Sequence, residues 1–304
     1  MAATATAPPV AAVRRGSRTA ALEAHRLLPR PLLVIVTVIL CAMVLIPTAY
    51  ILLASLNTDL GVAEGQFWPS TFSVASYTKI WTTANLATGL LNSIVIAGFT
   101  AVASALLGTV TAYVLVRYKF FGRLTILRGL VGLQSVPGTL MLLPVFVLFS
   151  SAGNYLGVTV VGTRWGLFIA YLTFALPFST WVMVTYLRGL PRELEEAART
   201  EGASTITILR RIIVPLSLPA IVVAGIFAFL LGWNDVLFAS VLTRPETHTA
   251  AVALQIFGSS QEGGALPVYS QMMAAALICA MPVVVLYLVF QRYLVGGLTA
   301  GGVK

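Results

Sequence analysis

Six runs of apolar residues divide the chain, and shorter segments rich in polar residues separate them. A helix needs about 20 apolar residues to cross the roughly 30 Å hydrocarbon core of a bilayer. Each run reaches that length; they cover residues 32–56, 86–116, 124–150, 165–187, 216–240 and 270–290. The pattern therefore predicts an all-α membrane protein with six transmembrane helices.

The segment 190–219 is the long charged stretch that lies between two apolar runs. Pro191 suits the first turn of a helix, Arg199 follows Glu195 by four residues, and glutamates crowd the first turn, where the helix dipole favours them. These glutamates are Glu193, Glu195 and Glu196. Gly202 can adopt a positive φ after the helix. We expect a short, solvent-facing helix that ends at this glycine.

A second helix is expected directly after that turn. Ser204 or Thr205 can cap it, and a stripe of apolar residues lies opposite Arg210 and Arg211. The stripe comprises Ile206, Leu209, Ile212 and Ile213. Helix, glycine turn and helix form an elbow at residues 188–215. From the residues alone, the elbow is either a surface that another protein approaches or an amphipathic connector on the lipid headgroups.

Composition and charge fix the class and the orientation. The chain has 304 residues, of which 58% are hydrophobic and 10% charged, and its mean hydropathy is +0.93. A net charge of +9 could indicate a nucleic-acid partner, but 16 of the 19 Lys and Arg residues lie before the first run, around residues 117–128, in the elbow and in the carboxy-terminal tail. This is the positive-inside pattern of membrane proteins. It predicts that both termini and the elbow are cytoplasmic and gives no support for nucleic-acid binding.

Asn234 and Asp235 bring polar side chains into the fifth apolar run. A carboxylate near the middle of a bilayer costs roughly 2.5 to 3.5 kcal/mol on insertion scales, so it normally faces a cavity or a partner. The pair either lines a polar pathway for hydroxylated cargo or makes a structural hydrogen bond between helices. His248, in the polar external segment 242–269, has no second ligand at metal spacing and is expected at the surface.

Small residues and prolines modify the spans. The second run carries a face that favours close helix packing; it comprises Gly98, Ala101, Ser104, Ala105, Gly108 and Ala112. Prolines inside the later runs are either hinges or static bends. They are Pro137, Pro144, Pro177 and Pro282.

The sequence carries no recognisable catalytic or cofactor-binding signature. No lysine stands in the Gly-Lys-Ser/Thr context of a phosphate-binding loop, and no His-Glu-x-x-His or Cys-pair metal site occurs. Cys41 and Cys279 lie far apart, within spans, and are expected to be small packing residues. We therefore predict a transport subunit without catalytic residues, bound metal or cofactor of its own.

The elbow resembles the signature loop of ABC-importer permeases. Glu196-Ala197-Ala198, three residues, Gly202, nine residues, Ile212, one residue and Pro215 match the family pattern E-A-A-x3-G-x9-I-x-L-P. Val214 departs from it, at a position where leucine is usual. In that family the loop docks into a cleft of the ATP-hydrolysing subunit. The resemblance implies that the residues of the motif contact such a subunit and transmit its motion.

Three further segments resemble the carbohydrate importers of that family. Residues 67–77, FWPSTFSVASY, are similar to their first external loop, although Ser76 stands where asparagine is frequent. The Trp-Asn-Asp arrangement at 233–235 is also common among them. The glycine-rich tail at 291–304 looks like that of the maltose-type half, which reaches between the two ATPase subunits. This likeness implies an ATPase interface at Thr299, Ala300, Gly301 and Gly302, whereas physics alone predicts a flexible end.

Three parts are expected along the chain. Composition predicts a basic, disordered cytoplasmic tail at residues 1–30, which lies outside the resemblance. The resemblance implies a six-helix domain of the type I ABC-importer permease fold at 31–290, with the elbow at 188–215, and a glycine-rich cytoplasmic tail at 291–304.

The resemblance to ABC-importer permeases also implies a function, and one alternative function is considered beside it. The expected protein is the permease subunit of an ATP-driven sugar importer in a bacterial cell membrane. Its partners would be a second permease, two ATPase subunits that bind ATP and Mg²⁺, an extracytoplasmic solute-binding protein and membrane lipid. The alternative is a proton-coupled secondary carrier in which Asp235 titrates.

Overall fold

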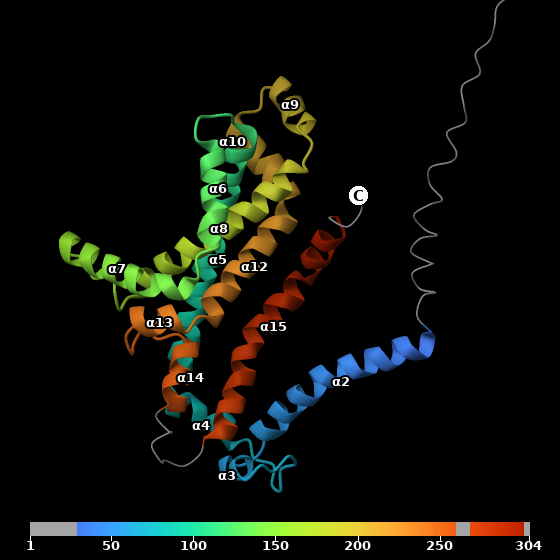
Figure 1. The fold of residues 1–304 in the computed structure, drawn as a ribbon, viewed down its shortest axis with the longest axis vertical. Helices are drawn as coiled ribbons and strands as arrows, with labels where there is room; N and C mark the ends of the chain where they lie inside the picture. Colours follow the sequence, from blue (N-terminus) through green and yellow to red (C-terminus); the bar gives the residue numbers. More distant parts are fainter. Residues whose placement is uncertain (1–28, 260–267, 301–304) are drawn as a thin grey trace, which may run out of the picture. The chain divides into compact units, whose positions relative to one another are not determined.

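The computed structural model describes residues 29–259 and 268–300, and these residues form helices joined by loops, with no strand among them (Figure 1). The chain divides into two units, Met1–Leu53 and Ala54–Lys304. Helix α2 (Arg30–Ser55) makes up nearly all of the described part of the first unit, and its last two residues belong to the second unit. Its bounds agree closely with the first expected span.

Three long helices form the centre of the second unit. They are α5 (Leu86–Arg117), α8 (Arg164–Arg188) and α12 (Leu218–Asn234), and each packs against the other two. Helix α15 (Tyr269–Ala300) packs along α12. The second and fourth expected spans match α5 and α8 to within a residue, whereas α15 continues as helix well beyond the expected end at residue 290.

The small-residue face of α5 brings α5 and α8 together over part of its length. A Cβ atom added to Gly108 would lie 3.1 Å from backbone atoms of Ser179 and Thr180, so a side chain here would push the two helices apart by a few tenths of an ångström. Ser104, Ala105 and Ala112 are buried on the same face. Gly98 differs, because a Cβ there would meet nothing within 4 Å.

The third expected span is not one helix. It is broken into α6 (Arg123–Gln134), the 3₁₀ turn η1 (Gly138–Met141) and α7 (Leu142–Leu156), and α7 turns aside from the line of α6 in Figure 1. Pro137 stands at the break with ψ of 123°. Proline disfavours helical geometry at the residue before it, so helix α6 ends ahead of this position. The expectation of one helix over 124–150 was therefore wrong.

The fifth expected span is shorter than its apolar run. Helix α12 ends at Asn234, Asp235 is extended with ψ of 133°, and the chain resumes as α13 (Leu237–Leu242). Before α12, the helical segment Thr205–Leu216, which includes α11 (Val214–Leu216), meets it at a bend of 76°. Five single helices are apolar and long enough to cross a membrane in the described ranges, or six when this bent pair counts as one.

At the end of the bundle opposite the elbow, short helices hold the start of α15. They are α3 (Asp59–Ala63), α4 (Ala75–Thr83) and α14 (Ala250–Ser259). The Asp59 carboxylate accepts hydrogen bonds from the backbone N–H of Ser270 at 2.9 Å and from Gln271 Nε2 at 3.0 Å. Ser76 is buried, and its hydroxyl lies 2.7 Å from that of Ser270. Serine thus fits at a position where the carbohydrate importers often have asparagine.

Candidate functional site

The charged segment folds as a helix, a glycine turn and a second helix, as its sequence predicts. Helix α9 (Glu193–Thr200) is followed by Gly202, whose φ is +82°, and then by α10 (Thr205–Ile208) and the π-helical turn η2 (Leu209–Ile213). Ser204 caps the second helix, because its Oγ accepts a hydrogen bond from the N–H of Thr207 at 3.3 Å. We call residues 188–215 the elbow.

The sequence led us to expect a solvent-facing helix. Glu195, however, is buried against the end of α5. Its Oε1 lies 2.5 Å from Arg117 Nε, and both side chains are only about 5% exposed. Tyr113 Oη donates to Glu195 Oε2 at 3.2 Å, and Arg117 Nη2 donates to the carbonyl of Leu190 at 3.3 Å. This is the one ion pair among the described residues. The i to i+4 pair with Arg199 is replaced by a bridge that fixes α9 to a spanning helix.

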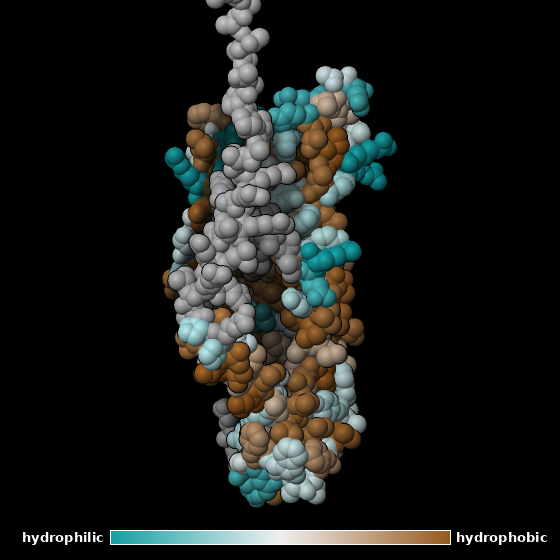
Figure 2. Space-filling view, turned by 90° about the vertical axis from the view of Figure 1, so that its right-hand side faces the viewer, coloured by the Kyte–Doolittle hydropathy of each residue, from teal (hydrophilic) through white to brown (hydrophobic). Residues whose placement is uncertain are grey.

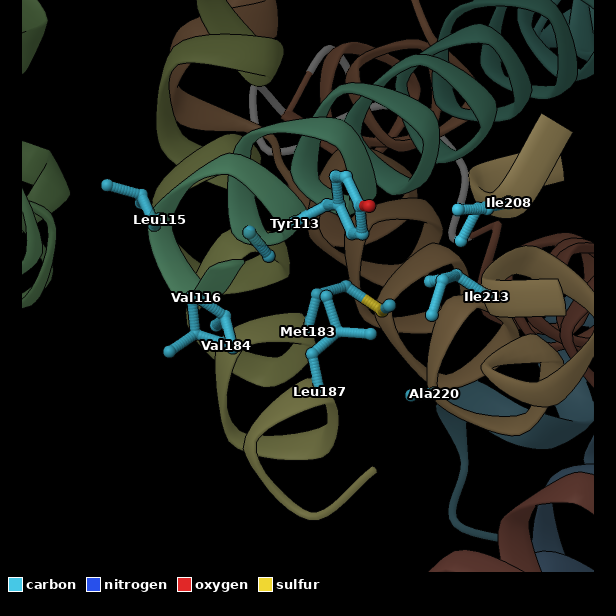
Figure 3. Packing of buried hydrophobic residues seen from close by; sticks show 10 residues of the cluster. Tyr113, Leu115, Val116, Met183, Val184, Leu187, Ile208, Ile213 and Ala220 are labelled. Carbon is cyan, nitrogen blue, oxygen red and sulfur yellow. The ribbon is translucent and has the colours of Figure 1, made fainter. Parts of the chain in front are cut away.

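An apolar cluster beneath the elbow joins it to three spanning helices. Figure 3 shows Met183 of α8 extending toward Ile213 of the elbow, with Tyr113 of α5 beside it. Ala198 and Ile212, two of the six motif residues, pack against this cluster. The elbow therefore packs directly against α5, α8 and α12.

The apolar stripe of the second helix differs from the expected one. Ile206 is 76% exposed, whereas Ile208, which the sequence pattern left out, is fully buried together with Ile213. Both residues that differ precede the π-helical turn η2, and Ile208 is the one that packs against residues of α5 and α8. Which side of α10 faces the spanning helices depends on tertiary packing, which a local amphipathic pattern does not encode.

The remaining motif residues face outward. Glu196, Ala197, Gly202 and Pro215 are exposed. Hydrophilic side chains gather at the end of the molecule where α9 lies, above a mostly hydrophobic body (Figure 2). The motif thus divides into an outer surface and an inner anchor.

Asn234 and Asp235 line a cavity of about 870 Å³ whose other lining residues come mainly from α6, η1, α7, α8, α12 and α13. Phenylalanines contribute much of the wall; they are Phe174, Phe178, Phe227 and Phe238. Asp235 accepts hydrogen bonds from Tyr171 Oη on α8 at 2.9 Å and from the N–H of Ala239 at 3.0 Å. Asp235 therefore makes the structural hydrogen bond that was one of the two alternatives, and it also lines the cavity.

A polar cluster that the sequence analysis missed joins the ends of α5 and α8 opposite the elbow to the loop before α14. The buried Asn92 amide donates to the carbonyls of Glu246 at 3.1 Å and His248 at 2.8 Å, and its Oδ1 accepts from Arg164 Nε at 2.7 Å. An asparagine in the first turns of an apolar run was the available signal. His248 is half-buried, not a surface residue, and its Nδ1 lies 2.8 Å from Thr243 Oγ1. Burial lowers the pKa of His248 below its ordinary value, and the nearby Glu246 opposes this effect.

The expected interface at residues 299–302 lies only partly within the described residues. Thr299 and Ala300 form the last residues of helix α15, while Gly301 and Gly302 lie outside the described residues. No group of three or more His, Cys, Asp or Glu side chains suited to a metal ion occurs in residues 29–259 or 268–300.

A bundle of membrane-length helices that encloses a part-polar cavity and carries an anchored elbow at one end has the architecture of a membrane transport subunit. Residues 104–299 match the model of a family described as binding-protein-dependent transport system inner membrane components. The chain belongs to this family and is a multi-pass component of a bacterial inner membrane.

Relatives support the assignment along most of the chain. The trehalose transport system permease protein SugB of Mycobacterium tuberculosis is 34% identical over 86% of this chain and 92% of its own length. The maltose/maltodextrin transport system permease protein MalG of Escherichia coli is 33% identical over 82% of this chain and 79% of its own. The alpha-glucoside transport system permease protein AglG of Rhizobium meliloti is 34% identical over 78% and 61%, respectively.

Solved structures share the fold. A chain from the crystal structure of a bacterial ABC transporter that imports the acidic polysaccharide alginate superposes with a TM-score of 0.72, at 21% identity, covering 92% of this chain and 98% of that one. A second, from an alginate transporter in complex with a periplasmic protein that holds an alginate pentasaccharide, gives 0.62 at 15% identity. The permease fold expected from the sequence is thereby confirmed.

Proposed function

We propose that this protein is the permease subunit of an ATP-driven importer for a sugar or oligosaccharide. The observation that carries the proposal is the divided elbow, in which Glu196, Ala197 and Gly202 face outward while Glu195 is locked to Arg117 of α5. A surface that is exposed on one side and anchored on the other suits the transfer of force from a partner to the spanning helices. The names of SugB, MalG and AglG, which refer to trehalose, maltose and alpha-glucosides, support a carbohydrate cargo.

Alternating access would follow from movement of the elbow. ATP-driven closure of two ATPase subunits would press the elbows of this chain and a second permease together and tilt α5, α8 and α12. ATP and Mg²⁺ belong to those ATPase subunits, and this chain contributes no catalytic residue. The roles of Glu196, Ala197, Ala198, Gly202, Ile212 and Pro215 in coupling are part of this proposal, as is the ATPase interface at 299–302.

The cavity at Asn234 and Asp235 is the proposed cargo pathway. Its volume of about 870 Å³ falls within the roughly 300 to 1,000 Å³ that small-molecule sites occupy. Aromatic faces pack against the apolar faces of sugar rings, and the polar residues can exchange hydrogen bonds with hydroxyl groups. An extracytoplasmic binding protein would deliver the sugar at the end of the bundle opposite the elbow, which requires both termini to be cytoplasmic.

A proton-coupled carrier is not favoured. The family is defined by dependence on a binding protein, and Asp235 already accepts hydrogen bonds from α8 and α13.

Co-purification tests the proposed docking surface. The chain is expressed with its ATPase subunits, and Glu196→Lys is compared with Glu201→Lys. The second substitution makes the same charge change at the exposed residue that caps the carboxyl end of α9. We expect Glu196→Lys to lose the ATPase subunits and Glu201→Lys to retain them. Equal retention by both variants would exclude Glu196 from the contact.

A further inference from the structure

Helices α6 and α8 enclose a groove near the elbow end of the bundle that the proposed function does not use. The groove has a volume of about 400 Å³ and is lined by one face of each helix. The α6 face comprises Leu124, Leu127, Arg128, Leu130 and Val131. The α8 face comprises Thr180, Trp181, Val184, Thr185 and Arg188. The walls are therefore mainly apolar, and each helix contributes one guanidinium group.

A smaller hollow adjoins the groove at Leu124, which lines both. It has a volume of about 350 Å³, and Lys119 and Arg123 are among its lining residues. The Nε atom of Arg123 is buried and has no hydrogen-bond partner among the described residues. A buried guanidinium N–H without an acceptor is costly, so this position favours a bound anion.

The cations around the groove lack partners within the described protein. Arg117 is neutralised by Glu195, but neither Arg128 nor Arg188 has a carboxylate within ion-pair distance in residues 29–259 and 268–300. No acidic side chain lines either hollow. The charge in this region is therefore of one sign, and an anionic ligand would complement it.

The length of the groove favours a ligand with an apolar part. Thr180 precedes Arg188 by eight residues, which is about 12 Å along a helix. Leu and Val side chains cover much of this distance. The fully buried Thr180 lines the groove, and its hydroxyl finds no hydrogen-bond partner among the described residues. A free inorganic anion would use the cationic end but leave the apolar walls empty.

We propose that the groove between α6 and α8 binds an anionic phospholipid, with its phosphate at Arg128 and Arg188 and an acyl chain along α8 toward Thr180. Lys119 and Arg123 extend the cationic surface for a second charge on the headgroup. Basic pockets between membrane helices bind such headgroups through the same combination of charge and apolar surface.

Photolabelling of the complete transporter tests the proposal. The complex is reconstituted in phosphatidylcholine bilayers, exposed to a photoactivatable phosphatidylglycerol or a photoactivatable phosphatidylcholine, and digested to map the labelled peptides. We expect phosphatidylglycerol to label α6 and α8 and Arg128→Gln with Arg188→Gln to reduce labelling by about fivefold for each guanidinium removed. Lysine at both positions should preserve most of the labelling.

Two further variants separate the apolar and electrostatic contributions. Val131→Trp keeps every charge but fills the groove from its exposed side, and it should reduce labelling. Arg210→Gln with Arg211→Gln removes the same charge from the elbow and should leave the α6 and α8 peptides labelled.

Three results would overturn the proposal. Equal labelling by the two lipids would reduce the groove to ordinary lipid contact. Displacement of the probe by inorganic phosphate at constant ionic strength would assign the cationic end to a soluble anion. Cross-linking of α6 to the second permease, with no lipid label, would show that protein covers the groove.

Discussion

At the scale of single residues, the most consequential side chain is Glu195, since it turns a surface helix into part of the membrane bundle. Its carboxylate joins Arg117 Nε and Tyr113 Oη at a buried position. A buried charge is tolerated only when it is paired. Both partners come from the last turns of α5, so the position of α9 depends on the end of that helix.

Removal of one partner should be costly. Glu195→Ala leaves Arg117 buried without its carboxylate, and we expect a loss of about 3 kcal/mol in the free energy of unfolding. Thermal unfolding of the purified complex measures the effect. Glu193→Ala, at an exposed position on the same helix, should change stability by less than about 0.5 kcal/mol. Similar effects of the two substitutions would show that the ion pair does not anchor the elbow.

His248 makes the stability of the polar cluster around Asn92 sensitive to acid. Because burial lowers its folded-state pKa, the unfolded chain binds more protons between that pKa and the ordinary value of about 6.5. The contribution of His248 is therefore fully present above about pH 6.5 and is lost as pH falls through the lowered pKa. We expect the melting temperature to fall less on acidification in His248→Gln than in the unaltered protein. An identical fall in both would exclude a role for this residue.

At the scale of helices, the bounds predicted from the sequence were accurate only where charged or polar residues flank the helix. Apolar periodicity located α5 and α8 to within a residue, because charged or polar residues flank both. The sequence predicted a hinge or static bend at Pro137, but the apolar runs did not predict that the helix ends there or that Asp235 is extended, since both lie inside continuous apolar runs. The elbow motif revealed the turn at Gly202, but the bridge from Glu195 to Arg117 joins residues 78 apart in sequence. Contacts of that kind depend on how the helices pack and are not encoded in local spacing.

The approach of α5 to α8 gives an element-scale prediction. Gly108→Leu should destabilise the bundle by about 2 kcal/mol, because the new side chain overlaps the backbone of α8. Gly98→Leu, on the same helix with open space around it, provides the matched control and should be tolerated. Thermal unfolding of the two variants in one detergent decides the matter, and equal stability would mean that α5 and α8 are less closely packed at Gly108.

The turn inside the elbow provides another prediction. Gly202→Ala places a Cβ at φ of +82° and should cost about 1 to 2 kcal/mol locally. Gly189→Ala is the control, because Gly189 has φ of −81°. Limited proteolysis of the elbow should be faster in Gly202→Ala alone. Equal cleavage of the two variants would argue against strain at this turn.

At the scale of the whole molecule, the second unit carries an anchored elbow at one end and a cavity of about 870 Å³ among its helices. Family membership fixes the class of transporter, while the coupling role of the elbow and the identity of the cargo remain proposals. Force applied at Glu196 and Ala197 would reach the cavity through Glu195, Arg117 and the apolar cluster shared with α8 and α12. We therefore expect coupling to require both the exposed and the buried residues of the elbow.

ATP-dependent sugar uptake into membrane vesicles tests whether the elbow couples ATP hydrolysis by the partner subunits to transport. The complex with the unaltered chain is compared with complexes that carry Glu196→Lys with Gly202→Pro or Glu201→Lys. We expect the unaltered and Glu201→Lys complexes to accumulate sugar only with ATP, and the double variant to lose uptake. Uptake that persists in the double variant, or that follows a proton gradient without ATP and disappears in Asp235→Asn, would contradict the account.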